Sequence, residues 1–197
     1  RLSLARSLVL EPKVMLLDEP LSNLDARLRL DMRSELQRLQ RSSGITMVFV
    51  THDQGEALAL ADRVVLMKDG VIEQMGTPAE LYNRPSTVFA ADFIGFENIF
   101  EVREGALIGS DGSKISGYNA PSGYLAWRPG GVSLGSGPFR GTVGGVSFAG
   151  EVWEYVITSP LGRITASTPA GNTPYPIGTT VGFDLLEQHG HRIKGAD

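Results

Sequence analysis

The sequence contains no cysteine among its 197 residues. This absence excludes disulfides and thiolate metal sites, and it is compatible with a reducing compartment. Long apolar runs are also missing, because stretches such as 14–17 and 47–50 are far shorter than the roughly 20 residues of a membrane-spanning helix. The chain has no recognisable signal peptide and begins with arginine rather than methionine, so we expect a piece of a longer protein.

A basic surplus is absent as well. Lys and Arg number 18 against 22 Asp and Glu, which gives a formal net charge of −4. Because a nucleic-acid coat needs an excess of positive charge, we expect no nucleic-acid partner. The hydrophobic share of 42% and the charged share of 20% are typical of a globular protein.

Glycine is scarce in the first half of the chain and abundant in the second. Residues 1–95 hold 5 of the 24 glycines and residues 96–197 hold 19, whereas 24 of the 40 charged residues lie in the first stretch. This contrast predicts an α/β part over 1–95, followed by an all-β part over 96–197. Short β-like runs between glycines and prolines, from Tyr124 to Leu185, predict a small barrel or sandwich there.

The first part alternates strand and helix patterns. Continuous apolar runs at 14–17 and 45–50 are typical of strands buried on both faces, and a helical period between them ends at Gly44. Asp69-Gly70 predicts a hairpin turn, and residues 77–80 predict a capping box at a helix start. Strand, helix and strand in this order predict a mainly parallel sheet.

The predicted central helix carries several basic side chains. They are Arg27, Arg29, Arg33, Arg38 and Arg41. Asp31 and Glu35 lie at spacings that allow Arg27–Asp31 and Glu35–Arg38 pairs, so we expect a solvated helix face.

Two adjacent carboxylates follow the first predicted strand, in the sequence Leu-Leu-Asp-Glu-Pro. In a phosphate-handling site Asp18 can bind Mg²⁺ through oxygen ligands, and Glu19 can polarise a water for attack on a terminal phosphate. The alternative is that both acids only begin a loop and cap the next helix. His52 follows the next predicted strand, and parallel strand ends meet at one sheet edge, so these side chains form one candidate site.

These motifs resemble the ATP-binding subunits of ABC transporters. The matching segments are RLSLARSL at 1–8, LLDEP at 16–20, SNLD at 22–25 and THD at 51–53. The resemblance implies that Asp18 ends the Walker B strand and binds magnesium, with Glu19 as the base that polarises water. It also implies that Asp25 belongs to the D-loop that crosses to a partner subunit, and that His52 is the switch histidine at the γ-phosphate. It covers residues 1–95 nearly continuously.

Later segments are similar to the importers of the sugar, iron, polyamine and sulfate group. They include QMGTPAELY at 74–82 and Phe93-Ile94-Gly95. Such subunits carry a C-terminal β domain of the OB type, called TOBE, which the resemblance places at 96–197. Trp127-Arg128-Pro129 resembles an Arg-Pro-Glu stretch of those domains, with Gly130 in place of the acid.

The resemblance therefore implies the C-terminal part of a P-loop ABC ATPase domain joined to a TOBE-like domain. ATP and Mg²⁺ would be bound by the parent, which would energise solute import. The implied partners are a second ATPase subunit, membrane permease subunits and, indirectly, a solute-binding protein. The implied location is peripheral, on the cytoplasmic face of the inner membrane.

The sequence lacks a GxxxxGK[ST] phosphate loop and an LSGGQ signature loop. Without backbone amides and a lysine to bind the phosphates, we expect the 197-residue chain alone not to hydrolyse ATP. Two alternatives stay open. One is a soluble ABC-type ATPase acting on nucleic acid or ribosomes, and the other is a purely regulatory and dimerisation module.

Overall fold

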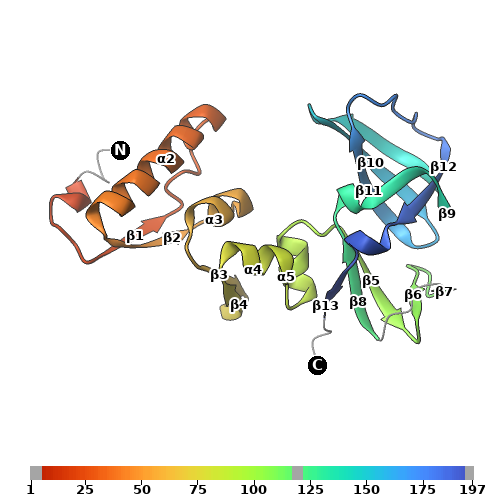
Figure 1. The fold of residues 1–197 in the computed structure, drawn as a ribbon, viewed down its shortest axis with the longest axis horizontal. Coiled ribbons are helices and arrows are strands. Elements are labelled where there is room, and N and C mark those ends of the chain that lie inside the picture. The colour runs from red at the N-terminus through yellow and green to blue at the C-terminus, as the bar shows by residue number, and fades with distance from the viewer. Residues whose placement is uncertain (1–5, 117–121, 194–197) are drawn as a thin grey trace. The chain divides into compact units, whose positions relative to one another are not determined.

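A computed structural model describes residues 6–116 and 122–193, and their contacts form two compact units that divide between Leu81 and Tyr82 (Figure 1). The elements of the first unit are β1 (Val14–Asp18), α2 (Ala26–Ser43), β2 (Thr46–Val50), α3 (Gln54–Leu60), β3 (Val64–Lys68), β4 (Val71–Gly76) and the first turn of α4 (Pro78–Asn83). The predicted order of strand, helix and strand is confirmed. Residues 2–10 have a helix-like pattern that ends before Pro12, and this segment lies partly outside the described residues.

Strands β1 and β2 pair in parallel, from Val14 opposite Thr46 to Asp18 opposite Val50. Helix α2 connects them, and it ends at Gly44, whose φ of +65° favours glycine. The predicted parallel pairing and the predicted helix end are both confirmed. Because the strands run in the same direction, the residues that follow them emerge at one edge of the sheet.

The prediction that these strands are buried on both faces is wrong for the described residues. Met15 is buried, but Leu16 is 74% exposed, and Val48 and Val50 are about half exposed. This sheet has two strands in the described part of the chain, and α2 lies along one side of it (Figure 1). The side chains that alternate to the other face are therefore exposed.

The hairpin of β3 and β4 turns at Asp69-Gly70, where both residues have positive φ, of 50° and 81°. This is the conformation that an Asp-Gly turn favours, as predicted. The capping box is also confirmed: the Thr77 amide donates to Glu80 Oε2 at 2.8 Å, and the Glu80 amide donates to Thr77 Oγ1 at 3.2 Å.

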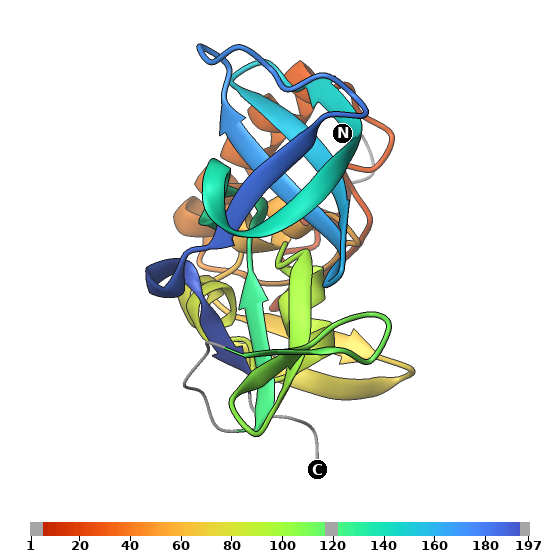
Figure 2. The same cartoon turned by 90° about the vertical axis from the view of Figure 1, so that its right-hand side faces the viewer.

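The second unit contains two antiparallel sheets (Figure 2). It begins within α4 and includes α5 (Val88–Phe93), β5 (Asn98–Arg103), β6 (Ala106–Ile108), β7 (Lys114–Ser116), β8 (Gly123–Trp127), β9 (Val132–Phe148), β10 (Val152–Ser159), β11 (Gly162–Pro169), β12 (Thr180–Leu185), β13 (His191–Ile193) and the short 3₁₀ turns η1 (Pro129–Gly131) and η2 (Glu187–His189). The strand orders are β13-β8-β5-β6-β7 and β11-β10-β9-β12. The β-rich second part is therefore confirmed.

One hydrophobic core is shared by both sheets of the second unit. It contains Trp127 and Val102 from one sheet and Ile157 and Phe183 from the other, all 1% exposed or less. Asn98 is equally buried, and it joins β5 to β11 because its amide donates to Thr165 O and its carbonyl accepts from the Thr165 amide, each at 2.8 Å. These paired hydrogen bonds satisfy a polar side chain that would otherwise destabilise the core.

Candidate active site

The first pair of predicted site residues lies at the carboxyl end of β1. Asp18 is the last residue of the strand, and Glu19 leaves it with a φ of +41°, a left-handed conformation that is uncommon for a side chain of this size. The Glu19 amide donates to Val50 O at 2.9 Å, so the turn stays attached to β2. Both acidic side chains are exposed at the edge of the sheet.

His52 follows β2 at the same edge, as predicted. Its Nδ1 donates to Glu19 Oε1 at 2.9 Å, while the side chains of His52 and Glu19 are 74% and 45% exposed. The structure thus brings together two residues that are 33 positions apart in the sequence. An imidazole and a carboxylate in hydrogen-bond contact, both open to solvent, can hold and move a proton.

The hydrogen bond to Glu19 raises the pKa of His52 above its ordinary value of about 6.5. The negative charge of the same carboxylate is the next cause, and the charges of Asp53 and Glu56 add to it. The pair therefore favours the protonated imidazole. A cationic ring at this edge would attract an anion such as a phosphate group.

Asp25 lies at the start of α2, where its Oδ1 accepts the Leu28 amide at 2.9 Å. It is the N-cap of the helix, and its backbone is extended. The helix-capping role that the sequence left open for Asp18 and Glu19 is thus performed by Asp25. In the structure Asp25 contacts its own helix, and no contact between its side chain and His52 or Glu19 is seen among the described residues.

No group of three or more acidic, histidine or cysteine side chains among residues 6–116 and 122–193 is arranged to hold a metal ion. Asp18 alone could contribute a carboxylate oxygen, as a hard divalent cation prefers. An exposed strand-end carboxylate fits a magnesium ion whose remaining ligands are water and substrate phosphates.

Two basic side chains of α2 are functional candidates that the sequence pattern did not indicate. Arg29 and Arg33 do not lie on a solvated helix face as predicted, since Arg29 Nη1 is 3.4 Å from Asp53 Oδ2 and Arg33 Nη2 is 3.7 Å from Asp53 Oδ1. The predicted pair of Arg38 with Glu35 is confirmed on the exposed side of α2. Helical spacing predicts partners on the same helix, but it carries no information about a neighbouring helix such as α3.

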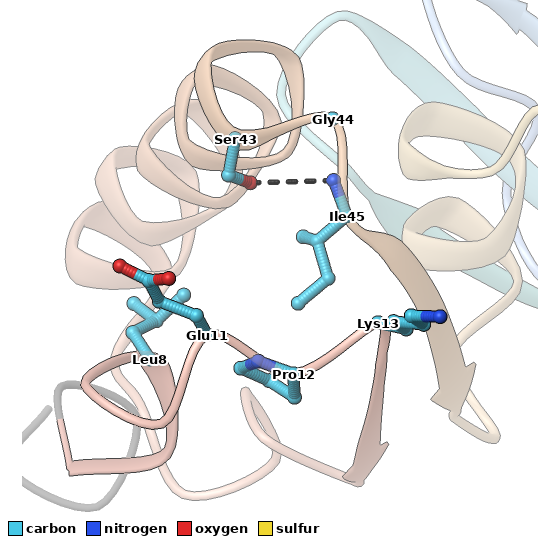
Figure 3. Close-up of a pocket in the computed structure, with 7 residues that line it drawn as sticks. All are labelled: Leu8, Glu11, Pro12, Lys13, Ser43, Gly44 and Ile45. Atoms are coloured by element: carbon cyan, nitrogen blue, oxygen red, sulfur yellow. Dashed lines mark hydrogen bonds between the residues drawn. The ribbon is translucent and has the colours of Figure 1, made fainter.

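A pocket of about 510 Å³ lies at the opposite ends of the strands (Figure 3). It is lined by Leu8, Glu11, Pro12, Lys13, Ser43, Gly44 and Ile45. Lys13 precedes β1 and Ile45 precedes β2, so this pocket lies at the amino ends of the strands, away from Glu19 and His52. Its lining is not part of the candidate active site.

Curated proteins match nearly the whole chain. The Fe(3+) ions import ATP-binding protein FbpC of Rhizobium etli is 42% identical over 202 residues, covering 93% of this chain and 56% of that protein. Similar values hold for FbpC 1 of Rhizobium meliloti, at 42% identity over 99% of this chain and 59% of that protein. The chain is a homologue of ABC importer ATP-binding subunits. The Spermidine/putrescine import ATP-binding protein PotA of Borreliella afzelii is also 42% identical, over 80% of this chain and 48% of that protein.

The likeness to these importer subunits extends over both structural units, because the Rhizobium meliloti match covers 99% of the chain. The chain spans about half the length of these relatives. No family model matches it.

Proposed function

We propose that this chain is part of the ATP-hydrolysing subunit of an ABC importer. The observation that carries the proposal is the contact of Glu19 with His52 beside Asp18, at the edge where two parallel strands end. The relatives are named as ATP-binding proteins for import of Fe(3+) or of spermidine and putrescine, and this supports the same class of activity here. The transported solute is not specified by these residues.

Each site residue has a role that fits its position. Asp18 would hold Mg²⁺, whose chemistry is to neutralise charge on the nucleotide phosphates. Glu19 would accept a proton from the attacking water, and His52 would contact the γ-phosphate while orienting the Glu19 carboxylate. Asp25 would lie in the loop that faces a second ATPase subunit, with its own helix held in place by its capping bond.

The second unit supports a finer proposal, that residues 96–197 form a TOBE-like domain. Its two antiparallel sheets around one core are compatible with an OB-like architecture.

We further propose residues 1–95 as the ATPase part, and membrane permease subunits and a solute-binding protein as further partners. No helix in the described part of the chain is long and apolar enough to cross a membrane. We propose a peripheral position on the cytoplasmic face of the membrane.

The test is Glu19→Gln in the complete subunit that contains this chain. ATP binding should persist, while steady-state turnover should fall by about 100-fold or more, since the glutamine cannot accept the proton. His52→Ala should also stop sustained hydrolysis. Glu11→Gln, in the pocket away from the site, is the matched control. Unchanged turnover in Glu19→Gln would refute the assigned base.

A further inference from the structure

A second cluster of charged side chains lies between α2 and α3, next to the loop that carries His52. Its centre is Glu56, which is only 2% exposed. Glu56 Oε2 accepts a hydrogen bond from Thr51 Oγ1 at 2.8 Å, and Glu56 Oε1 is 3.8 Å from Arg29 Nε. A buried carboxylate is strongly unfavourable unless it is paired and hydrogen-bonded, so these two partners fix where α3 can lie.

Arg29 joins three parts of the chain through one guanidinium group. Besides Glu56, it contacts Asp53 Oδ2 through Nη1 at 3.4 Å. Its Nη2 donates to the Leu24 carbonyl at 3.1 Å, and Leu24 immediately precedes Asp25. Because a guanidinium is planar and rigid, these contacts define the position of the loop before α2 relative to the loop after β2.

The residues on both sides of His52 belong to this network. The Asp53 amide donates to Thr51 Oγ1 at 3.0 Å, and Asp53 Oδ1 accepts the Glu56 amide at 2.9 Å as the N-cap of α3. Arg33 adds an ion pair with Asp53 at 3.7 Å. His52 itself is exposed and contacts Glu19. The backbone that carries the imidazole is therefore held by the contacts of the neighbouring residues, while the ring itself is exposed to solvent and contacts Glu19.

We propose that Arg29 and Glu56 are positioning residues. They hold the loop after β2, which carries His52, in a fixed position relative to the loop before α2, which contains Asp25, so that the imidazole reaches Glu19. This inference rests on the proposed function for its effect on turnover, and it stands on the contacts of the first unit for its effect on geometry. A change at either loop would be transmitted to the other through Arg29. Neither Arg29 nor Glu56 needs to touch the nucleotide for this role.

The geometric part is tested by Arg29→Met in the 197-residue chain, with the ring of His52 titrated by NMR. Loss of positioning should weaken the contact with Glu19, so the pKa of His52 should fall toward about 6.5. If the variant only removed a nearby positive charge and the positioning were kept, the pKa of His52 would rise instead of fall. The carboxylates that face His52, namely Glu19, Asp53 and Glu56, are retained in this variant.

A pKa of His52 that is unchanged or raised would overturn the proposal. Arg38→Met is the control, since it removes the same charge from the exposed side of α2. If Arg29→Met does not fold, Arg29→Lys decides, because lysine keeps the charge but cannot reach Leu24, Asp53 and Glu56 together. Its expected result is a smaller fall in the pKa of His52, and an unchanged pKa would count against the proposal.

The catalytic part is tested in the complete subunit by the same variants. Misplacement of His52 should lower kcat by about 10- to 100-fold, with the KM for ATP nearly unchanged, since the positioning residues do not bind the nucleotide. A kcat equal to that of Arg38→Met would overturn this part. If the unmodified subunit has no ATPase activity, the proposed function fails, whereas the titration of His52 still decides the positioning role.

Discussion

The imidazole of His52 connects the local electrostatics of the site to a measurable pH dependence. Since the pKa of His52 is raised in the folded chain, the protonated ring binds Glu19 more tightly than the neutral ring does. The stabilisation from this pair is fully present below pH about 6.5 and is lost as the pH rises through the raised value. We expect Glu19→Gln to return the pKa of His52 to its ordinary range in an NMR titration. A raised value in that variant would show that Glu19 is not the main cause.

Arg128 is the residue of the Trp-Arg-Pro stretch whose role the structure explains. Its guanidinium lies 3.7 Å from the centre of the Tyr82 ring and 3.9 Å from the centre of the Phe96 ring, and Nη2 donates to Tyr82 O at 2.8 Å. A flat cation between two aromatic faces needs no acid beside it. This arrangement is compatible with Gly130 in the position where the resemblance expects a carboxylate.

We predict that Arg128→Lys destabilises the second unit by about 1–2 kcal/mol, because an ammonium group cannot stack on both rings. Chemical denaturation followed by tryptophan fluorescence measures this change, since both tryptophans, Trp127 and Trp153, lie in the second unit. Arg163→Lys, at an exposed position on β11, is the control and should cost less than about 0.5 kcal/mol. Equal stabilities of the two variants would contradict the stacking role.

Strand β9 shows where a glycine is required at the level of an element. In the pairing of β9 with β12, Gly182 is opposite Arg140 and the next residue, Phe183, is opposite Leu134. The β9 residues between Leu134 and Arg140 therefore have no partner in β12 and form an irregularity in the strand. Gly137 lies in this segment with a φ of +139°. A Cβ at Gly137 would overlap the backbone carbonyl of Phe183. The two strands can therefore approach each other only without a side chain there.

We predict that Gly137→Ala destabilises the second unit by about 2–3 kcal/mol, through both the clash and the backbone strain. Gly150→Ala is the matched control, because Gly150 also has a positive φ, of 81°, but has open space around it. It should cost only about 1 kcal/mol. Thermal unfolding of both variants distinguishes the two contributions, and similar melting temperatures would show that the clash is relieved by movement of β12.

Local patterns in the sequence were sufficient for the elements that have a local cause. Gly44, Asp69-Gly70 and the Thr77–Glu80 box set the limits of their elements through short-range geometry, and each is confirmed. The contact of Glu19 with His52 followed from parallel pairing of two strands. In contrast, the partners of Arg29 and the hydrogen bonds of Asn98 with Thr165 depend on which elements pack together. A single sequence does not contain that information in a readable form. The short strands β5 to β7 and the helix α5 were missed for the same reason.

At the scale of the whole molecule, the first unit combines the candidate catalytic side chains with an apolar sheet face that is exposed. Alternate residues of β1 and β2, including Leu16 and Val50, are exposed beside Asp18 and Glu19. The chain also spans only about half the length of its relatives. The site residues in this chain thus form one part of the machinery that we propose, and the phosphate-binding loop is not in its sequence.

We therefore predict that the 197-residue chain binds ATP weakly and shows no measurable magnesium-dependent hydrolysis, because it has no amide-rich loop and lysine for the phosphates. Calorimetric titration with ATP and a phosphate-release assay measure the two properties. The Glu19→Gln chain is the control for contaminating activity. Robust hydrolysis by the unmodified chain, absent from this control, would contradict the prediction.

The left-handed backbone of Glu19 implies a conflict between durability and activity. A glutamate at a φ of +41° carries strain on the order of 1 kcal/mol, which glycine at the same position would relieve. Selection for heat resistance alone would therefore favour Glu19→Gly, and the more durable chain would lack the carboxylate that His52 contacts. The strained turn is the reason that an engineering effort guided only by melting temperature would remove the side chain on which the proposed chemistry depends.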